Sequence, residues 1–121
     1  MGKLLIVGIG PGNYENMTIR ADRALKESQV IVGYTVYVDL VKERDPEKKY
    51  ITTPMTREVQ RCQMALEEAR TGETVAMICS GDSGVYGMAA LLYELRGESR
   101  EPEIEVIPGL TAACSGGALL G

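Results

Sequence analysis

Short apolar runs alternate along the chain with longer segments in which apolar residues recur at helical spacing. The runs have the length and composition of strands that are buried on both faces of a parallel sheet. The sequence predicts five such strands, at residues 3–7, 30–32, 50–52, 74–79 and 104–107. Gly33 follows the second run directly, and we expect it to end that strand.

The segment after the first strand predicts a helix that Thr18 can cap, with Ile19, Ala24 and Leu25 on its apolar side. The segment 34–43 is ambiguous. Apolar residues at 36, 40 and 41 have helical spacing, whereas those at 36, 38 and 40 fit the alternation of a strand equally well. We favour the helix.

Two more helices are expected later in the chain. Thr56 is placed to open the first of them, and Gly72 ends it. The second spans residues 85–95, and Gly97 stands where a C-cap glycine belongs. Their inward stripes are Val59, Cys62, Leu66 and Ala69 in the first, and Met88, Leu91, Leu92 and Leu95 in the second.

Strands that alternate with helices in this way predict an α/β fold, an open, largely parallel five-stranded sheet with helices on both faces. With 121 residues and no linker-like segment, the chain is expected to be one domain. Residues 110–121 carry no charge, and an apolar helix of this kind is normally covered. We therefore expect further polypeptide to pack on it, which would make the chain half of an enzyme.

Composition removes several classes of function. The chain has no histidine, which excludes an imidazole base, a His-Asp triad and histidine metal ligands. A net charge of −4 argues against nucleic acid as a partner. Three cysteines without a CxxC pair indicate reduced core thiols in a cytoplasmic protein and no metal site. The first apolar run is too short for a signal peptide or a membrane span.

Three glycine-rich segments follow predicted strands, at residues 8–13, 80–87 and 107–112. Ligands of open parallel sheets collect at the carboxyl ends of strands, where helix N-termini offer free N–H groups. Each segment alone also fits an ordinary turn. The first fails as a dinucleotide fingerprint because Asn13 takes the place of the third glycine. In the second, Asp82 fits a helix cap, and Ser83 lacks a histidine base that would make it a nucleophile.

Taken together, these segments resemble the tetrapyrrole (corrin/porphyrin) methylase family. The matching pieces are VGIGPG at 7–12 followed by MT at 17–18, SGDSGVYG at 80–87, and IPGLTA at 107–112. The resemblance covers residues 1–121 as the N-terminal domain of a two-domain family, and the C-terminal domain would be absent from this chain. Residues 31–37, 55–59 and 84–89 are most similar to members that methylate C17 of a precorrin-3-type macrocycle, with ring contraction, in cobalamin biosynthesis.

The resemblance implies S-adenosylmethionine as the cofactor, bound between the two domains, and a tetrapyrrole substrate beside it. It implies cofactor contacts from Pro11, Gly81, Asp82, Ser83, Val85, Tyr86, Thr111 and Ala112, and macrocycle contacts from Gly10 and Gly12. Asp82 would favour the cationic methyl donor. No residue is assigned as catalytic acid or base.

Two other interpretations stay open from the residues alone. A Rossmann-type nucleotide-binding module without methyltransferase activity is disfavoured by Asn13 and by Gly33-Tyr34, where an acidic residue would be needed. The apolar segment 110–121 is also a candidate self-association surface, so we expect a homodimer. Of the six tyrosines, most are expected in core and rim positions, with Tyr86 as the exception.

Overall fold

The computed structural model describes residues 2–9, 18–54, 56–79 and 81–108, and for residues 81–83 the backbone alone. Five parallel strands form one sheet in the order β3-β2-β4-β1-β5. The strands are β1 (Lys3–Gly8), β2 (Val30–Tyr34), β3 (Lys49–Thr53), β4 (Thr74–Cys79) and β5 (Glu103–Ile107). The helices are α1 (Ile19–Glu27), α2 (Thr35–Lys42), α3 (Glu58–Arg70) and α4 (Gly81–Arg96). The predicted fold class is confirmed.

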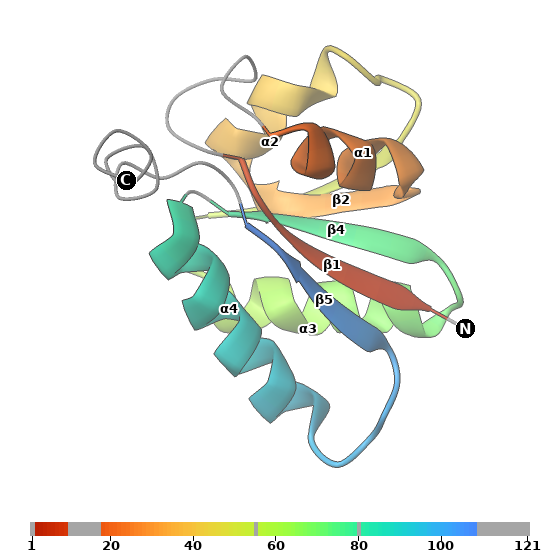
Figure 1. The fold of residues 1–121 in the computed structure, drawn as a ribbon, viewed down its shortest axis with the longest axis vertical. Helices are drawn as coiled ribbons and strands as arrows, with labels where there is room; N and C mark the ends of the chain where they lie inside the picture. Colours follow the sequence, from red (N-terminus) through yellow and green to blue (C-terminus); the bar gives the residue numbers. More distant parts are fainter. Residues whose placement is uncertain (1, 10–17, 55, 80, 109–121) are drawn as a thin grey trace, which may run out of the picture.

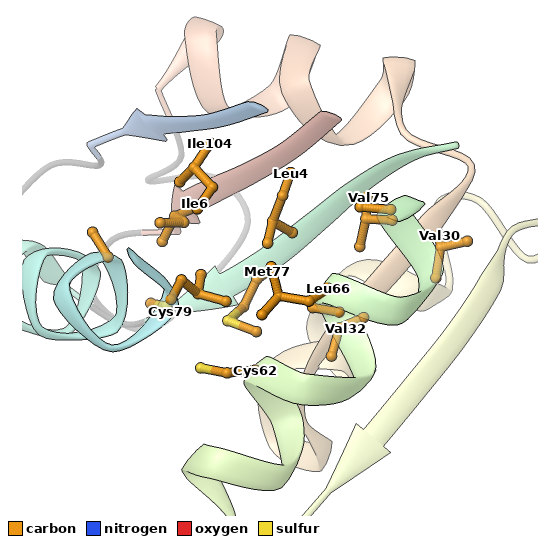
Figure 2. Packing of buried hydrophobic residues seen from close by; sticks show 14 of the residues in the cluster. Leu4, Ile6, Val30, Val32, Cys62, Leu66, Val75, Met77, Cys79 and Ile104 are labelled. Carbon is orange, nitrogen blue, oxygen red and sulfur yellow. The ribbon is translucent and has the colours of Figure 1, made fainter. Parts of the chain in front are cut away.

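The sheet lies between two layers of helices, with α1 and α2 on one face and α3 and α4 on the other (Figure 1). Side chains of a strand point alternately to the two faces, so β1 supplies both cores. Leu4 and Ile6 pack toward α3 and α4, whereas Leu5 and Val7 pack toward α1 and α2. Figure 2 shows the first of these cores, in which Leu4 and Ile6 face Met77 of β4 and the α3 side chains.

The face of the sheet that each helix covers is related to the edge toward which its crossover connection runs. The chain moves toward the β3 edge through α1 and α2, and back toward the β5 edge through α3 and α4. When all crossovers have the same hand, helices that connect strands in opposite directions along the sheet must cover opposite faces of it. The connections that leave β2 and β4, which are neighbours, therefore diverge to opposite faces and opposite edges. This is the topological switch point, where open α/β sheets bind ligands.

The N-terminal helix begins as predicted. Thr18 is the N-cap of α1, and its Oγ1 accepts a hydrogen bond of 3.0 Å from the backbone N–H of Ala21. Ala24 and Leu25 are buried on the apolar side, whereas Ile19 is 75% exposed and lies outside the core.

The ambiguous segment is the helix α2, and its apolar residues Val38 and Val41 are buried against the sheet. The strand before it was predicted to end at Gly33, but it continues through Tyr34. Gly33 is packed so tightly that an added Cβ would lie 2.4 Å from Cγ1 of Ile78. The missing side chain therefore serves close packing inside the strand.

Helix α3 begins at Glu58, and the prediction that Thr56 opens it is wrong. Thr56 lies in a turn in which the N–H of Arg57 bonds the carbonyl of Pro54 at 3.1 Å, so the helix starts after that turn. Val59 does not join the inward stripe and is 50% exposed. The rest of the stripe, Cys62, Leu66 and Ala69, is buried as predicted.

Helix α4 begins at Gly81, earlier than predicted, so most of the segment 80–87 is helix rather than loop. Asp82 accordingly lies within the first turn and is not the N-cap.

The two expected stop signals are confirmed, because Gly72 and Gly97 have φ values of +101° and +69°, the left-handed region that favours glycine.

Candidate functional site

The three strands that precede the glycine-rich segments are neighbours and end at one edge of the sheet. Gly8 of β1 pairs with Cys79 of β4, and Val7 pairs with Ile107 of β5. The N–H of Ile9 then bonds the carbonyl of Cys79 at 3.0 Å, which extends this register past the end of β1. Segments that follow these strands therefore start side by side, as the predicted site requires.

A cavity of about 400 Å³ opens at the carboxyl ends of β2 and β4. Its position coincides with the topological switch point. Helices α2, α3 and α4 supply the remaining wall. The lining residues are Tyr34, Tyr37, Glu58, Arg61, Ile78, Cys79, Gly84, Gly87, Met88 and Leu91.

One wall of the cavity is aromatic. The rings of Tyr34, at the end of β2, and Tyr37, in the first turn of α2, meet edge to face with centroids 5.5 Å apart and planes at 82°. This arrangement is the favourable one for two aromatic rings, and it holds both side chains beside the opening. Both tyrosines thus contribute to the candidate site, in addition to the structural role that the sequence suggested for them.

A second wall is a glycine face of α4. A Cβ added at Gly87 would meet no atom within 4 Å, and one at Gly84 would meet only the Cβ of Cys79 at 3.9 Å. Both glycines line the cavity, and neither is required by tight packing. Their missing side chains leave room for a ligand to approach the helix backbone closely.

The polar groups of the cavity come from α3. Arg61 is 5% exposed, and its Nε donates to Oγ1 of Thr53 at 2.7 Å while an Nη donates to the carbonyl of Pro54 at 3.0 Å. Glu58, one turn earlier, is exposed and lies on the same wall. The pair gives the cavity one buried positive charge and one solvent-facing negative charge.

The two cysteines in the described part of the chain are buried free thiols, as predicted. Burial raises the pKa of Cys62 to about 11 and that of Cys79 to about 12, although the positive charge of Arg61 acts in the opposite direction. Sγ of Cys62 also contacts Sδ of Met88 at 3.1 Å. Neutral thiols are poor nucleophiles, so Cys79 is a wall of the cavity rather than a reactive group. Cys114 lies outside the described residues.

The predicted site residues fall into three groups. Val85 is fully buried in the core under α4, and Tyr86 is 59% exposed near the start of that helix. Neither is among the residues that line the cavity. The backbone of residues 81–83 forms the first turn of α4. Gly10, Pro11, Gly12, Thr111 and Ala112 lie outside the described residues.

The predicted site residues whose side chains the structure describes do not line the cavity, and its aromatic and charged residues in the described part of the chain, Tyr34, Tyr37, Glu58 and Arg61, were all missed. A signal existed for three of them, because they belong to segments 31–37 and 55–59, which carry the most specific part of the family resemblance. No sequence signal pointed to Arg61, since an arginine next to an inward stripe usually faces water.

Other site types find no support in the parts of the chain that are placed. Over residues 2–9, 18–54, 56–79 and 84–108, no group of three or more cysteine, aspartate or glutamate side chains is arranged to hold a metal ion. Within the same residues, every helix is too short or too polar to cross a membrane.

A doubly wound parallel sheet with a cavity at its switch point defines a small-molecule-binding α/β domain. The model of the Tetrapyrrole (Corrin/Porphyrin) Methylases matches residues 3–121, and the chain belongs to this family.

Individual relatives agree with this assignment. The chain is 49% identical to a cobalt-factor III methyltransferase of Priestia megaterium over 99% of its own length and 23% of the relative's. It is 45% identical to a probable cobalt-factor III C(17)-methyltransferase of Salmonella typhimurium, over 98% of this chain and 49% of the relative. The chain therefore spans at most about half the length of these two curated relatives.

Solved structures show the same fold. The methyltransferase CobJ superimposes with a TM-score of 0.82 at 34% identity, over 100% of this chain and 52% of that one. A uroporphyrin-III C-methyltransferase of Thermus thermophilus, complexed with S-adenyl homocysteine, gives a TM-score of 0.70 at 26% identity, over 96% and 48% of the two chains.

Proposed function

We propose that this chain is the N-terminal half of an S-adenosylmethionine-dependent methyltransferase that methylates C17 of a precorrin-3-type macrocycle, with ring contraction, in cobalamin biosynthesis. The observation that carries the proposal is the cavity of about 400 Å³ at the switch point, beside the edge where the segments after β1, β4 and β5 begin. The relatives named as cobalt-factor III methyltransferases support a cobalt-bearing macrocycle as the substrate.

The proposed cofactor fits the walls of the cavity. S-Adenosylmethionine supplies an electrophilic methyl group on a positively charged sulfur. Gly84 and Gly87 leave the backbone of α4 open to a ligand, and the rings of Tyr34 and Tyr37 offer an apolar wall of the same cavity. The complex of the related uroporphyrin-III methyltransferase with S-adenyl homocysteine supports this choice of cofactor. We retain residues 81–83, 85–86, 111–112 and Pro11 as its proposed contacts, and Gly10 and Gly12 as contacts of the macrocycle.

The main tasks of this chain in the reaction are to position the two reactants and to exclude water from them. Methyl transfer is an in-line displacement, so the protein must hold the donor and the acceptor carbon aligned at roughly 3–3.5 Å. No imidazole base is needed for this step, in keeping with a chain that has no histidine. The carboxylate of Asp82, in the first turn of α4, would favour a cationic donor nearby. For ring contraction we nominate no residue.

We also propose that the protein is a cytoplasmic homodimer. The buried reduced thiols Cys62 and Cys79 support a reducing compartment. The uncharged segment 110–121 supports an apolar surface that is covered in the assembled protein. Light scattering of the purified protein tests the homodimer, and a monomer at every concentration would contradict it.

The activity can be tested with the protein at its full natural length. Incubated with S-adenosylmethionine labelled in the methyl group and with cobalt-factor III, it should transfer one labelled methyl group to the macrocycle, detected by mass spectrometry. NMR of the product should place the new methyl on C17. Methylation at another carbon would overturn the regiochemistry, and no transfer together with no binding of S-adenosylhomocysteine would overturn the proposed activity.

A Rossmann-type nucleotide-binding module is the weaker candidate. The structure has Gly33 and Tyr34 at the end of β2, where a dinucleotide site would need an acidic side chain. Tight binding of NAD by the full-length protein would nevertheless favour it over the methyltransferase.

A further inference from the structure

Burial sets Arg61 apart from the other arginines in the described part of the chain. It is 5% exposed, whereas arginines are rarely buried unless they are paired. Its two hydrogen bonds go to Oγ1 of Thr53 and the carbonyl of Pro54, and both acceptors are neutral. Among residues 2–9, 18–54, 56–79 and 84–108, whose side chains the structure describes, no carboxylate lies within 4.0 Å of its guanidinium nitrogens.

A buried charge that is balanced only by neutral dipoles is unfavourable, and it gains strongly when an anion reaches it. Arg61 lines the cavity at the switch point, so a ligand in that cavity can supply the anion. The guanidinium has five N–H donors in a fixed fork, and the bonds to Thr53 and Pro54 use two of them. Those bonds also fix the orientation of the side chain before a ligand arrives.

We propose that Arg61 binds a carboxylate group of the ligand that occupies this cavity. The proposal rests on the proposed function for the identity of the ligand. A planar guanidinium fork matches a carboxylate in shape and charge, and in a mostly apolar cavity such a pair is stronger than at a surface. Two ligands of the proposed reaction carry carboxylates: the amino-acid end of the methyl donor, and the acetate and propionate side chains of a precorrin-type macrocycle.

Glu58 restricts the position that a ligand carboxylate can take in the cavity. It lines the same cavity from one turn earlier on α3 but is exposed to solvent, whereas Arg61 is buried. A ligand carboxylate is therefore attracted to the buried Arg61 and repelled by the solvent-facing Glu58. This polarity orients a ligand that has a carboxylate at one end.

The test compares ligands with and without the carboxylate, using the full-length protein. Arg61→Met removes the charge at similar volume, and Arg70→Met is the matched control, because it removes the same charge from an exposed position at the far end of α3, about 14 Å along the helix. Calorimetry measures binding of S-adenosylhomocysteine and of its decarboxylated analogue. The second pair is cobalt-factor III and the same macrocycle with its carboxylates esterified.

We expect Arg61→Met to weaken one carboxylate-bearing ligand by about 10- to 100-fold and its carboxylate-free partner by less than about 3-fold. The ligand pair that shows this difference identifies the source of the carboxylate. Arg70→Met should leave all four affinities unchanged. Should Arg61→Met fail to fold, Arg61→Lys keeps the charge but loses the fork, and a loss of about 3- to 10-fold confined to the carboxylate-bearing ligand is expected.

Equal losses for both members of each pair, or no loss at all, would overturn the proposal and leave Arg61 with a structural role in the β3–α3 turn. That result is distinct from failure of the proposed function. If the wild-type protein binds neither S-adenosylhomocysteine nor the macrocycle, the proposed function itself falls, and the assignment of Arg61 falls with it.

Discussion

Nε of Arg61 and Oγ1 of Thr53 form a hydrogen bond of 2.7 Å in which both side chains are buried. The bond joins the first turns of α3 to the last residue of β3, across the turn at Pro54. It therefore fixes the start of a helix and one wall of the cavity at the same time. A hydrogen bond with a charged donor in such a place is among the stronger single contacts in a protein.

Replacing Thr53 with valine should destabilise the protein by about 1.5–3 kcal/mol, because the shape is kept while a buried guanidinium loses an acceptor. Thr52→Val is the matched control. It makes the same substitution at the exposed neighbouring position of β3 and should change the free energy of unfolding by less than about 0.5 kcal/mol. Urea denaturation measures both values, and equal effects of the two substitutions would contradict the importance of the bond.

Gly87→Ala should separate stability from binding. An interior helix glycine is about 1 kcal/mol less favourable than alanine, and the added methyl group meets open space, so the variant should be more stable than the wild type by up to about 1 kcal/mol. The same methyl group stands at the wall of the cavity and should weaken binding of S-adenosylhomocysteine.

Gly33→Ala is the opposite case, because its Cβ would lie 2.4 Å from Cγ1 of Ile78 in the core. It should destabilise the protein by roughly 1–3 kcal/mol, as overpacking does. Thermal melts and calorimetry on both variants measure these effects. Unchanged affinity in Gly87→Ala would show that the ligand does not reach this face of α4.

The regular parts of the fold were predictable because local and tertiary preferences agree there. Thr18 caps α1, and Gly72 and Gly97 take up the left-handed conformation after α3 and α4. Each of these residues satisfies backbone groups within its own turn, so neighbouring sequence is sufficient to recognise it.

The predictions failed where distant packing decides the outcome. Residues 81–87 contain three glycines, which disfavour a helix locally, yet α4 starts at Gly81. Packing of Val85, Ala89 and Leu92 against the sheet outweighs that local preference. At the start of α3, Thr56 has the right side chain for a cap, but the turn at Pro54 delays the helix to Glu58.

The edge of the sheet at which the glycine-rich segments begin was predictable, but the cavity and its walls were not. The carboxyl ends of parallel strands meet at one edge of the sheet, so the sequence places the segments after β1, β4 and β5 at that edge. The cavity itself lies at the carboxyl ends of β2 and β4, and its buried positive charge comes from Arg61. Burial of that arginine depends on contacts with Thr53 and Pro54, which the spacing of apolar residues does not reveal.

The two buried thiols should make stability depend on pH in the alkaline range. Burial raises the pKa of Cys62 from 9.0 to about 11 and that of Cys79 from 9.0 to about 12. The folded state thus keeps protons that the unfolded chain releases above pH 9. Their contribution is complete below pH 9 and is lost as the pH rises toward 11–12, by up to about 1.4 kcal/mol per pH unit for each thiol.

The measurement is the free energy of unfolding between pH 8 and 11, for the wild type and for the Cys62→Ala/Cys79→Ala variant. The variant starts from a lower stability because it has small cavities, but its curve should fall less steeply above pH 9. The difference between the two slopes isolates the thiols from the lysines that titrate in the same range, such as Lys3, whose pKa is raised chiefly by its hydrogen bond to Glu105. Parallel curves would contradict the raised pKa values of the two thiols.

The 121-residue chain alone should bind S-adenosylhomocysteine weakly or not at all, whereas the protein at its full natural length should bind it tightly. The cavity has walls from β2, β4 and three helices, but the chain spans only about half of the related methyltransferases CobJ and the uroporphyrin-III enzyme. A ligand held by one half alone remains partly hydrated and loses the contacts of the other half. Calorimetry on both proteins tests this, with circular dichroism as the control that the short chain is folded. Equal affinities would show that residues 1–121 form the whole cofactor site, and tight binding of NAD in place of S-adenosylhomocysteine would contradict the methyltransferase.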